Sequence, residues 1–361
     1  MDVPLQAGLH ADARDSILTV RRWWKTIVVL VIVSLIVLAL CLQYGTERIA
    51  LADVVRILLG RGADVTSNAS GVSPSIILLE VRLPRLILAF LVGASLAAIG
   101  VALQALLRNP LADPYILGIS GGAALGAALA VQFGVSWAMG GFSAVQVFAF
   151  LAAGLTILVI YRIAVSDGRI PVQTLLLAGV IINAILSALI LFITSLSDST
   201  SAFRLFFWLM GSLATLGYAG LGALTVYVLL GIGLLFGQAR QLNLLSLGEE
   251  PAQGAGLQVE SVKRVIFFTS ALLTGAAVAV SGLIGFVGMI VPHGARMVFG
   301  PDHRLLLPAA AIVGGTFLAI ADTVARSLLA PSELPVGVIT ALCGGPFFIY
   351  LLVSRRKDSI G

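Results

Sequence analysis

Residues 82–122 decide the fold of this chain, and they read RLPRLILAFLVGASLAAIGVALQALLRNPLADPYILGISGG. Between Arg85 and Arg108 no side chain carries a charge. A helix rises about 1.5 Å per residue, so roughly 20 apolar residues cross the ~30 Å hydrocarbon core of a bilayer. Pro84 suits the first helical turn, where a missing N–H has no partner to lose. The stretch therefore predicts a membrane-spanning helix.

The whole chain has the composition of a protein that crosses the membrane many times. Of its 361 residues 59% are hydrophobic and 11% are charged, and the mean hydropathy is +1.07. About a quarter of the residues of a soluble domain are charged. So apolar a chain is not disordered. The two cysteines, Cys41 and Cys343, both lie in apolar stretches, which excludes a secreted disulfide scaffold.

Further stretches without charge extend the prediction to ten spans. The run 114–161 is long enough for two spans joined by a turn from Gly134 to Gly141, and the run 265–295 predicts a full span followed by a short one. The expected spans are 26–46, 86–107, two within 114–161, 170–197, one in 205–239 that begins near Gly217, two within 265–295, 305–325 and 334–354. We thus predict an all-α membrane domain over residues 26–354.

Basic residues flank this domain at both ends. They lie in the segment 1–25, before the first span, and in the tail 355–361, after the last. Because basic segments stay in the cytoplasm, both ends are expected there, which requires an even number of spans. The first apolar stretch is too long for a cleaved signal peptide and lacks a small-residue cleavage site.

The chain also contains a predicted internal duplication. Residues 91–118 align with residues 273–300, which pairs Pro110 with Pro292 and Gly118 with Gly300. The two copies lie five spans apart, an odd number, so they would enter the membrane in opposite directions. Inverted repeats of this kind are typical of transporters.

Several kinds of chemistry are excluded or weakened by the sequence. No lysine follows a glycine, so the chain has no phosphate-binding P-loop, and it has no HExxH metal motif. We expect no metal site. Asp322 precedes Arg326 by four residues, which favours an ion pair on one helix over a proton relay.

One motif suggests a different function. Gly118-Ile119-Ser120-Gly121 matches the GxSG pattern of intramembrane serine proteases, with His293 as a possible base. We favour another interpretation, in which Gly118, Gly122 and Gly126 lie on one helix face and let a second helix approach closely.

The polar loop 240–264 predicts two short helices joined at Gly248. Leu247 ends the first, and Glu249, Glu250 and Pro251 open the second, where the helix dipole favours acidic residues. These leucines have no lipid to face, so the loop is either a docking platform for a cytoplasmic partner or a connector packed on its own membrane domain.

Arginines gather on the opposite side of the membrane. Arg82 and Arg85 begin the second span and Arg326 ends the ninth. Such a ring suits an acidic partner or an anionic cargo. Salt bridges to nearby acidic residues are the alternative. The other arginines between the first two spans are Arg48, Arg56 and Arg61.

Residues 82–122 resemble the signature of the FecCD-type permeases of bacterial ABC importers, which carry ferric siderophores, haem or cobalamin. Similar family motifs are TLLLAGV (174–180), LLSLGEEPAQGAGL (244–257), SGLIGFVGMIVPHGARM (281–297) and ELPVGVITALCGGPFFIYLL (333–352). The resemblance implies the type II, cobalamin-importer-like fold with ten helices, in the bacterial inner membrane. It also implies an identical or different second permease as partner, and a cargo that is most often a ferric siderophore.

The same resemblance implies how the chain works with its partners. Two ATPase subunits bind ATP and Mg²⁺ and dock against the loop 240–264, so this chain is not an enzyme and holds no cofactor. A periplasmic binding protein places acidic residues on Arg82, Arg85 and Arg326. The path is lined by the fifth span and a short helix near 203–213, with a cytoplasmic gate at Val172 and Gln173. No nucleic acid is involved. An ion-coupled secondary transporter is the alternative outside this family.

Overall fold

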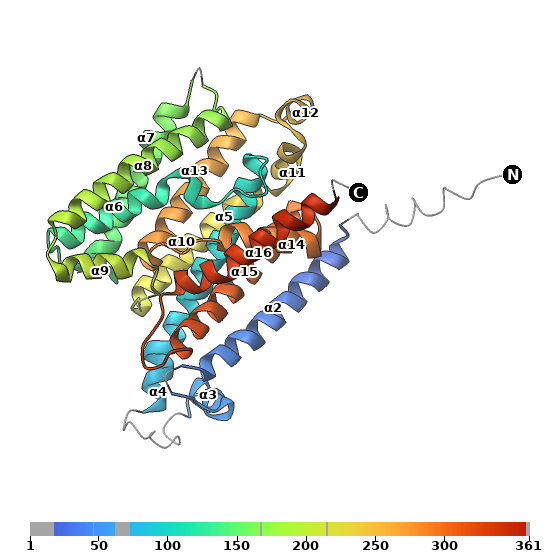
Figure 1. Ribbon diagram of the computed structural model, residues 1–361. Helices are drawn as coiled ribbons and strands as arrows, with labels where there is room; N and C mark the ends of the chain where they lie inside the picture. The colour runs from blue at the N-terminus through green and yellow to red at the C-terminus, as the bar shows by residue number, and fades with distance from the viewer. Residues whose placement is uncertain (1–17, 46, 62–72, 167, 214–215, 359–361) are drawn as a thin grey trace.

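The computed structural model describes residues 18–45, 47–61, 73–166, 168–213 and 216–358, with side chains up to residue 349. The described chain is a bundle of helices, many of them running alongside one another, with α2, α15 and α16 along one side (Figure 1). The helices before the hairpin are α2 (Val20–Gln43), α3 (Leu51–Leu58), α4 (Pro74–Ile76), the π-helix η2 (Ile77–Arg82), α5 (Leu83–Leu106), the 3-10 helix η3 (Pro114–Leu117) and α6 (Ile119–Gln132).

A small antiparallel hairpin of β1 (Ala138–Met139) and β2 (Phe142–Ser143) follows at the predicted turn. The remaining helices are α7 (Ala144–Ala164), α8 (Val172–Leu196), α9 (Ser199–Leu209), α10 (Tyr218–Gly237), α11 (Ala239–Leu247), α12 (Glu249–Gly254), α13 (Val259–Ser281), α14 (Val287–Phe299), α15 (His303–Ser327) and α16 (Val336–Asp358).

Seven of the described helices are long and apolar enough to cross a membrane: α2, the continuous helix Pro74–Leu106, α7, α8, α10, α13 and α15. The helix α6 is apolar but shorter, and so is Val336–Ile349, the part of α16 whose side chains are described. The helix α14 has 13 residues. This confirms the all-α membrane fold. The total of ten spans and the inverted repeat stay predictions.

Several span boundaries differ from the prediction because charge-free runs underestimate helix length; α13, for example, begins at Val259 and not at 265. α2 begins at Val20, where Thr19 accepts a hydrogen bond from the backbone N–H of Arg22 at 3.2 Å, so part of the predicted segment 1–25 is helical. The second span begins at Pro74 and passes through Arg82 and Arg85. Its two arginines lie in the helix because other parts of the protein contact them. Residues 1–17 and 359–361 of the predicted terminal segments lie outside the described residues.

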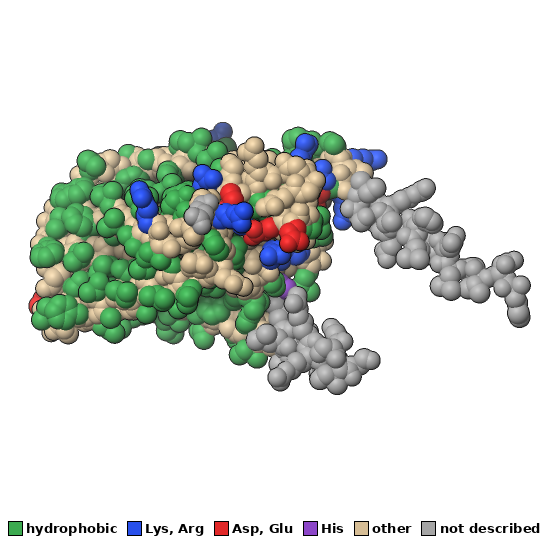
Figure 2. All heavy atoms as spheres, turned by 90° about the horizontal axis from the view of Figure 1, so that it is seen from above, with side chains coloured by type: hydrophobic (Ala, Val, Ile, Leu, Met, Phe, Trp, Pro, Cys, Tyr) green, Lys and Arg blue, Asp and Glu red, His purple; other side chains and the backbone are tan. Residues whose placement is uncertain are grey.

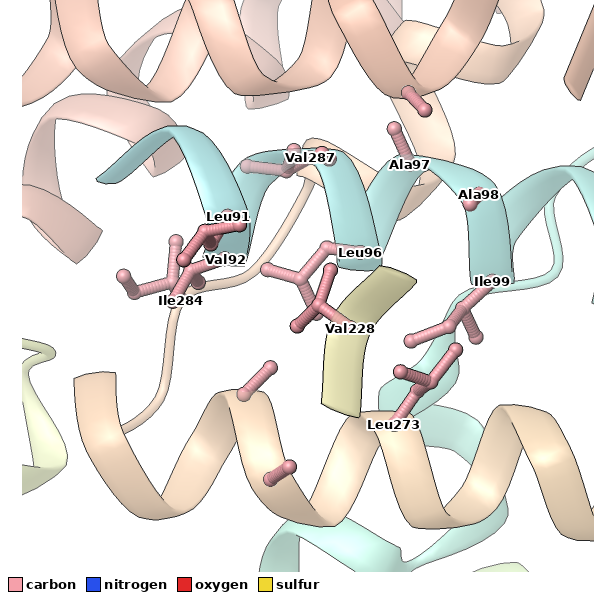
Figure 3. Packing of buried hydrophobic residues seen from close by; sticks show 14 of the residues in the cluster. Leu91, Val92, Leu96, Ala97, Ala98, Ile99, Val228, Leu273, Ile284 and Val287 are labelled. Atoms are coloured by element: carbon pink, nitrogen blue, oxygen red, sulfur yellow. The ribbon is translucent and has the colours of Figure 1, made fainter. Parts of the chain in front are cut away.

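α5 forms the centre of the bundle, and almost all of its residues from Leu86 to Leu106 are buried. Figure 3 shows why: Leu96 on α5 faces Val228 of α10, while Leu273 of α13 and Val287 of α14 lie close by. A helix that is apolar on every side needs neighbours on every side. The quoted stretch is therefore the protein core and not a lipid-facing span.

Glycines set the distance at which α14 and α15 pack against α5. A Cβ atom added to Gly100 would lie 1.8 Å from the carbonyl oxygen of Gly288 on α14, and one added to Gly93 would lie 2.2 Å from that of Gly314 on α15. Only glycine allows the backbones to come this close.

Replacing Gly100 with alanine is therefore expected to push α14 away from α5 and to destabilise the protein by about 1–3 kcal/mol. Thermal unfolding in detergent measures the effect. Gly154→Ala is the matched control, because nothing lies within 4 Å of a Cβ atom there. Equal unfolding temperatures for the two variants would contradict the packing argument.

Candidate functional site

The loop 240–264 forms two short helices at one end of the bundle, α11 and α12, seen near the top of Figure 1. Gly248 joins them with a φ of +126° and a ψ of 159°, a backbone conformation that L side chains rarely adopt. Leu242 and Leu245 face the protein, whereas Leu247 is 71% exposed although it lies outside every candidate span. An exposed leucine at this place suits contact with a partner protein.

A buried lysine anchors α12 to the membrane domain. Lys263 of α13 is 3% exposed, and its Nζ donates to Glu249 at 2.6 Å, to Glu260 at 3.1 Å and to the carbonyl oxygen of Ile170 at 3.3 Å. The second carboxylate oxygen of Glu260 accepts from the backbone N–H of Ile170 at 2.7 Å. An ammonium group has three N–H donors, so all three of those on Lys263 are engaged.

This anchor reaches the predicted gate. Ile170 lies just before α8, whose first residues are Val172, half-buried, and Gln173, exposed. One ammonium group thus connects the loop 240–264 to the start of α8. Sequence reasoning missed Lys263, although a rare lysine three residues after a glutamate on a span was a usable signal.

A second anchor holds α11. The side-chain amide of Asn243 donates to Asp302 at 2.9 Å and accepts from the backbone N–H of His303 at 2.9 Å. Although partial burial opposes it, hydrogen bonds from Arg304 and Asn243 lower the pKa of Asp302 to about 2. The stabilisation is therefore complete above the ordinary Asp pKa of 3.8 and is lost only as the pH falls through about 2.

Charged side chains of both signs gather on this face. In the view from above, most of the Lys, Arg, Asp and Glu side chains lie in the right half of this face, while the left half is mostly hydrophobic (Figure 2).

At the opposite end, the structure buries two of the three predicted docking arginines. Arg82 is 3% exposed and donates to the carbonyl oxygens of Leu42 at 2.9 Å and Gln43 at 3.1 Å, and also to that of Glu47. It therefore ties the end of α2 to the start of α5. Its guanidinium is thus engaged inside the protein, and a role of Arg82 in docking stays a prediction.

Arg85 and Arg326 share one buried carboxylate. Arg85 donates to both oxygens of Asp322, at 2.9–3.1 Å, and to Glu333 at 2.8 Å. The predicted Asp322–Arg326 pair is present at 3.6 Å, but Asp322 is 0% exposed and Arg326 is 6% exposed. Only Arg85, at 13%, keeps part of its guanidinium near solvent. The reason is tertiary: α15 places Asp322 against α5.

The glycines of the GxSG motif have separate structural roles. Added Cβ atoms at Gly122 and Gly126 would lie 2.1 Å from Thr156 and 2.3 Å from the Phe148 carbonyl oxygen, so both glycines pack against α7. Gly118 does not share their helix face, because it precedes α6 with a φ of +73°.

The same region has no assembled serine-protease pair. The Ser120 hydroxyl is buried and has no hydrogen-bond partner among the described residues, so it is not bonded to His293. A serine nucleophile needs its base within hydrogen-bond reach. Within the described residues no group of three or more His, Cys, Asp and Glu side chains could hold a metal ion.

α8 is long and apolar but mostly exposed. Its exposed residues form two faces. Ile181, Ile185, Leu189, Phe192 and Leu196 make one apolar face. The other face carries Gln173, Ser187 and Ser195 together with exposed Leu177, Val180 and Leu191, so polar and apolar side chains alternate along it.

Comparison with known proteins shows which family has this architecture. The model of the FecCD transport family matches residues 29–354. The cobalamin import system permease protein BtuC of Halobacterium salinarum is 44% identical over 78% of this chain and 74% of its own. The hemin transport system permease protein HmuU of Yersinia pestis is 44% identical over 78% and 85%. A solved metal-chelate-type ABC transporter in an inward-facing conformation has a TM-score of 0.79 and 32% identity, over 91% of this chain and 99% of its own.

The chain thus belongs to the FecCD transport family. It is a multi-pass membrane permease, as the sequence motifs predicted.

Proposed function

We propose that this chain is the membrane-spanning permease of an ATP-driven importer for a metal chelate in the bacterial inner membrane. The observation that carries the proposal is the pair α11–α12, which lies outside the candidate spans, exposes Leu247 and is connected through Lys263 to the start of α8. A transporter that received its energy from an ion gradient would have no use for such a platform. We place both termini and α11–α12 in the cytoplasm, because basic residues concentrate there.

In this proposal two ATPase subunits, which bind ATP and Mg²⁺, dock on α11–α12. A second permease covers the apolar face of α8, and the cargo passes along the face that carries Gln173, Ser187 and Ser195. Val172 and Gln173 form the cytoplasmic gate region. The cargo crosses unchanged, and this chain holds no cofactor for it.

A periplasmic binding protein docks at the opposite end. Of the three arginines, Arg85 can reach an acidic partner, because part of its side chain is accessible and its partner Glu333 is 51% exposed. Arg82 and Arg326 are buried beside Arg85 and hold the end of α2 against α5 and α15. The exposed Arg48, next to the Glu47 that Arg82 contacts, adds positive charge there.

The cargo of the proposed importer is a metal chelate. A ferric siderophore is the first candidate from the family resemblance, and haem and cobalamin follow. Two of the relatives are named as permeases for cobalamin and hemin import.

The test is uptake by proteoliposomes that contain the chain together with the ATPase subunits and the binding protein of its importer. We expect one of ferric siderophore, haem and cobalamin to accumulate, and only with ATP on the ATPase side. Accumulation driven by an ion gradient without ATPase subunits would establish a secondary transporter instead. Peptide cleavage that is lost in Ser120→Ala would establish a protease.

A second prediction concerns the platform itself. Leu247→Glu is expected to weaken copurification of the ATPase subunits roughly tenfold or more, because burial of a leucine contributes about 1.5–3 kcal/mol. Phe133→Glu is the control, since Phe133 is 74% exposed at the other end of the bundle. Unchanged copurification in Leu247→Glu would mean that α11–α12 is only a connector.

A further inference from the structure

A cavity of about 500 Å³ lies where α2, α10, α11 and α15 meet, at the end of the bundle that carries α11 and α12. Apolar residues line it, among them Trp23 and Phe236. Polar residues line it as well, namely Thr19, Arg240, Gln241 and Arg304. The cavity therefore offers both kinds of contact that an amphipathic ligand needs.

The charged side chains that line the cavity are positive and therefore attract anions. Two arginines line it, and no aspartate or glutamate does. Arg240 is exposed and makes no hydrogen bond or ion pair with the residues that the structure describes. Arg304 pairs with Asp302 at 2.5 Å but keeps 43% of its side chain exposed.

The cavity also lies at the level where lipid headgroups begin. Three candidate spans, α2, α10 and α15, end at it. The indole N–H of Trp23 donates to the carbonyl oxygen of Arg304 at 2.9 Å, and the ring of the 58% exposed Trp24 packs edge-on against it. Tryptophans with one polar contact and one apolar side concentrate at this depth of a membrane.

We propose that this cavity binds the headgroup of an anionic phospholipid, such as phosphatidylglycerol. The phosphate lies between Arg240 and Arg304, and the acyl chains follow the exposed apolar side chains of α2, among them Val28. The inference rests on the proposed placement of this end at the cytoplasmic membrane surface. The bound lipid would hold α11 against the bilayer, next to the surface of α11–α12 on which the ATPase subunits are proposed to dock.

Native mass spectrometry of the chain, purified from equal parts phosphatidylglycerol and phosphatidylcholine, tests the proposal. We expect the wild-type chain to retain phosphatidylglycerol preferentially. Arg240→Gln should lower that preference about fivefold, which corresponds to ~1 kcal/mol for one basic residue near an anionic membrane surface. Arg162→Gln, an exposed arginine in the last turn of α7 outside the cavity, should change nothing.

Equal retention of the two lipids, or an unchanged preference in Arg240→Gln, would overturn the proposal. Displacement of the retained lipid by millimolar inorganic phosphate would also overturn it, because the site would then bind a small free anion. The readout needs neither ATP nor partner subunits, so a failed lipid site and a failed importer give different results.

Discussion

Replacing Lys263 with methionine is expected to reduce cargo uptake per hydrolysed ATP about tenfold, while ATP hydrolysis by the reconstituted complex continues. Lys263 is the ammonium that holds Glu249 of α12, Glu260 of α13 and the carbonyl oxygen of Ile170 together. Without it two carboxylates face each other, and α12 can move without moving α8. A tenfold change lies within the 1–3 kcal/mol typical of coupling between distant sites.

The measurement is the ratio of uptake to phosphate release in the same proteoliposomes. Arg264→Met is the matched control, because Arg264 is the next residue along α13 and is exposed. The triple variant Lys263→Met, Glu249→Gln, Glu260→Gln removes the repulsion as well as the anchor. It should recover stability but not coupling, which separates transmission from a merely structural role. A normal ratio in Lys263→Met would show that motion reaches α8 by another route.

Asp322→Asn is expected to destabilise the protein by about 3–5 kcal/mol, the largest loss among the substitutions considered. Asp322 is fully buried and neutralises Arg85 and Arg326, so the variant leaves two arginines in the interior without their shared counter-ion. Breaking a buried ion pair by removing one partner has a cost of this size.

Thermal or denaturant unfolding in detergent gives the value. Glu333→Gln is the control; its carboxylate also contacts Arg85 but is half exposed, so its loss should stay below about 1 kcal/mol. Arg326→Gln added to Asp322→Asn should restore part of the stability, since Arg326 is the charge left without its counter-ion, whereas Arg85 keeps Glu333. Equal effects of Asp322→Asn and Glu333→Gln would mean that the cluster is solvated.

The elements that sequence reasoning located well are those that local rules determine. The hinge at Gly248, the start of α10 after Gly217 and the turn between α6 and α7 each depend on glycines and on neighbouring residues. The ends of the spans were less accurate, since a run without charge stops at Arg85 although the helix does not.

Local sequence rules could not predict whether Arg82, Arg85 and Arg326 are buried or exposed. Arg85 and Asp322 are far apart in sequence and meet only because α5 and α15 pack together, so nothing near either residue indicates that both are buried. Lys263 is a similar case, because its partners come from three separate segments.

By itself the sequence determined that this chain is a polytopic helical membrane protein of the FecCD transport family, because hydropathy and family motifs are properties of residues in order along the chain. Only the tertiary structure decided that α5 is the core and that Arg82 and Arg326 are buried at the end of α2. It also decided that Lys263 connects α12 to α8. Burial and ion pairing depend on which helices become neighbours, and that is settled by packing over the whole bundle.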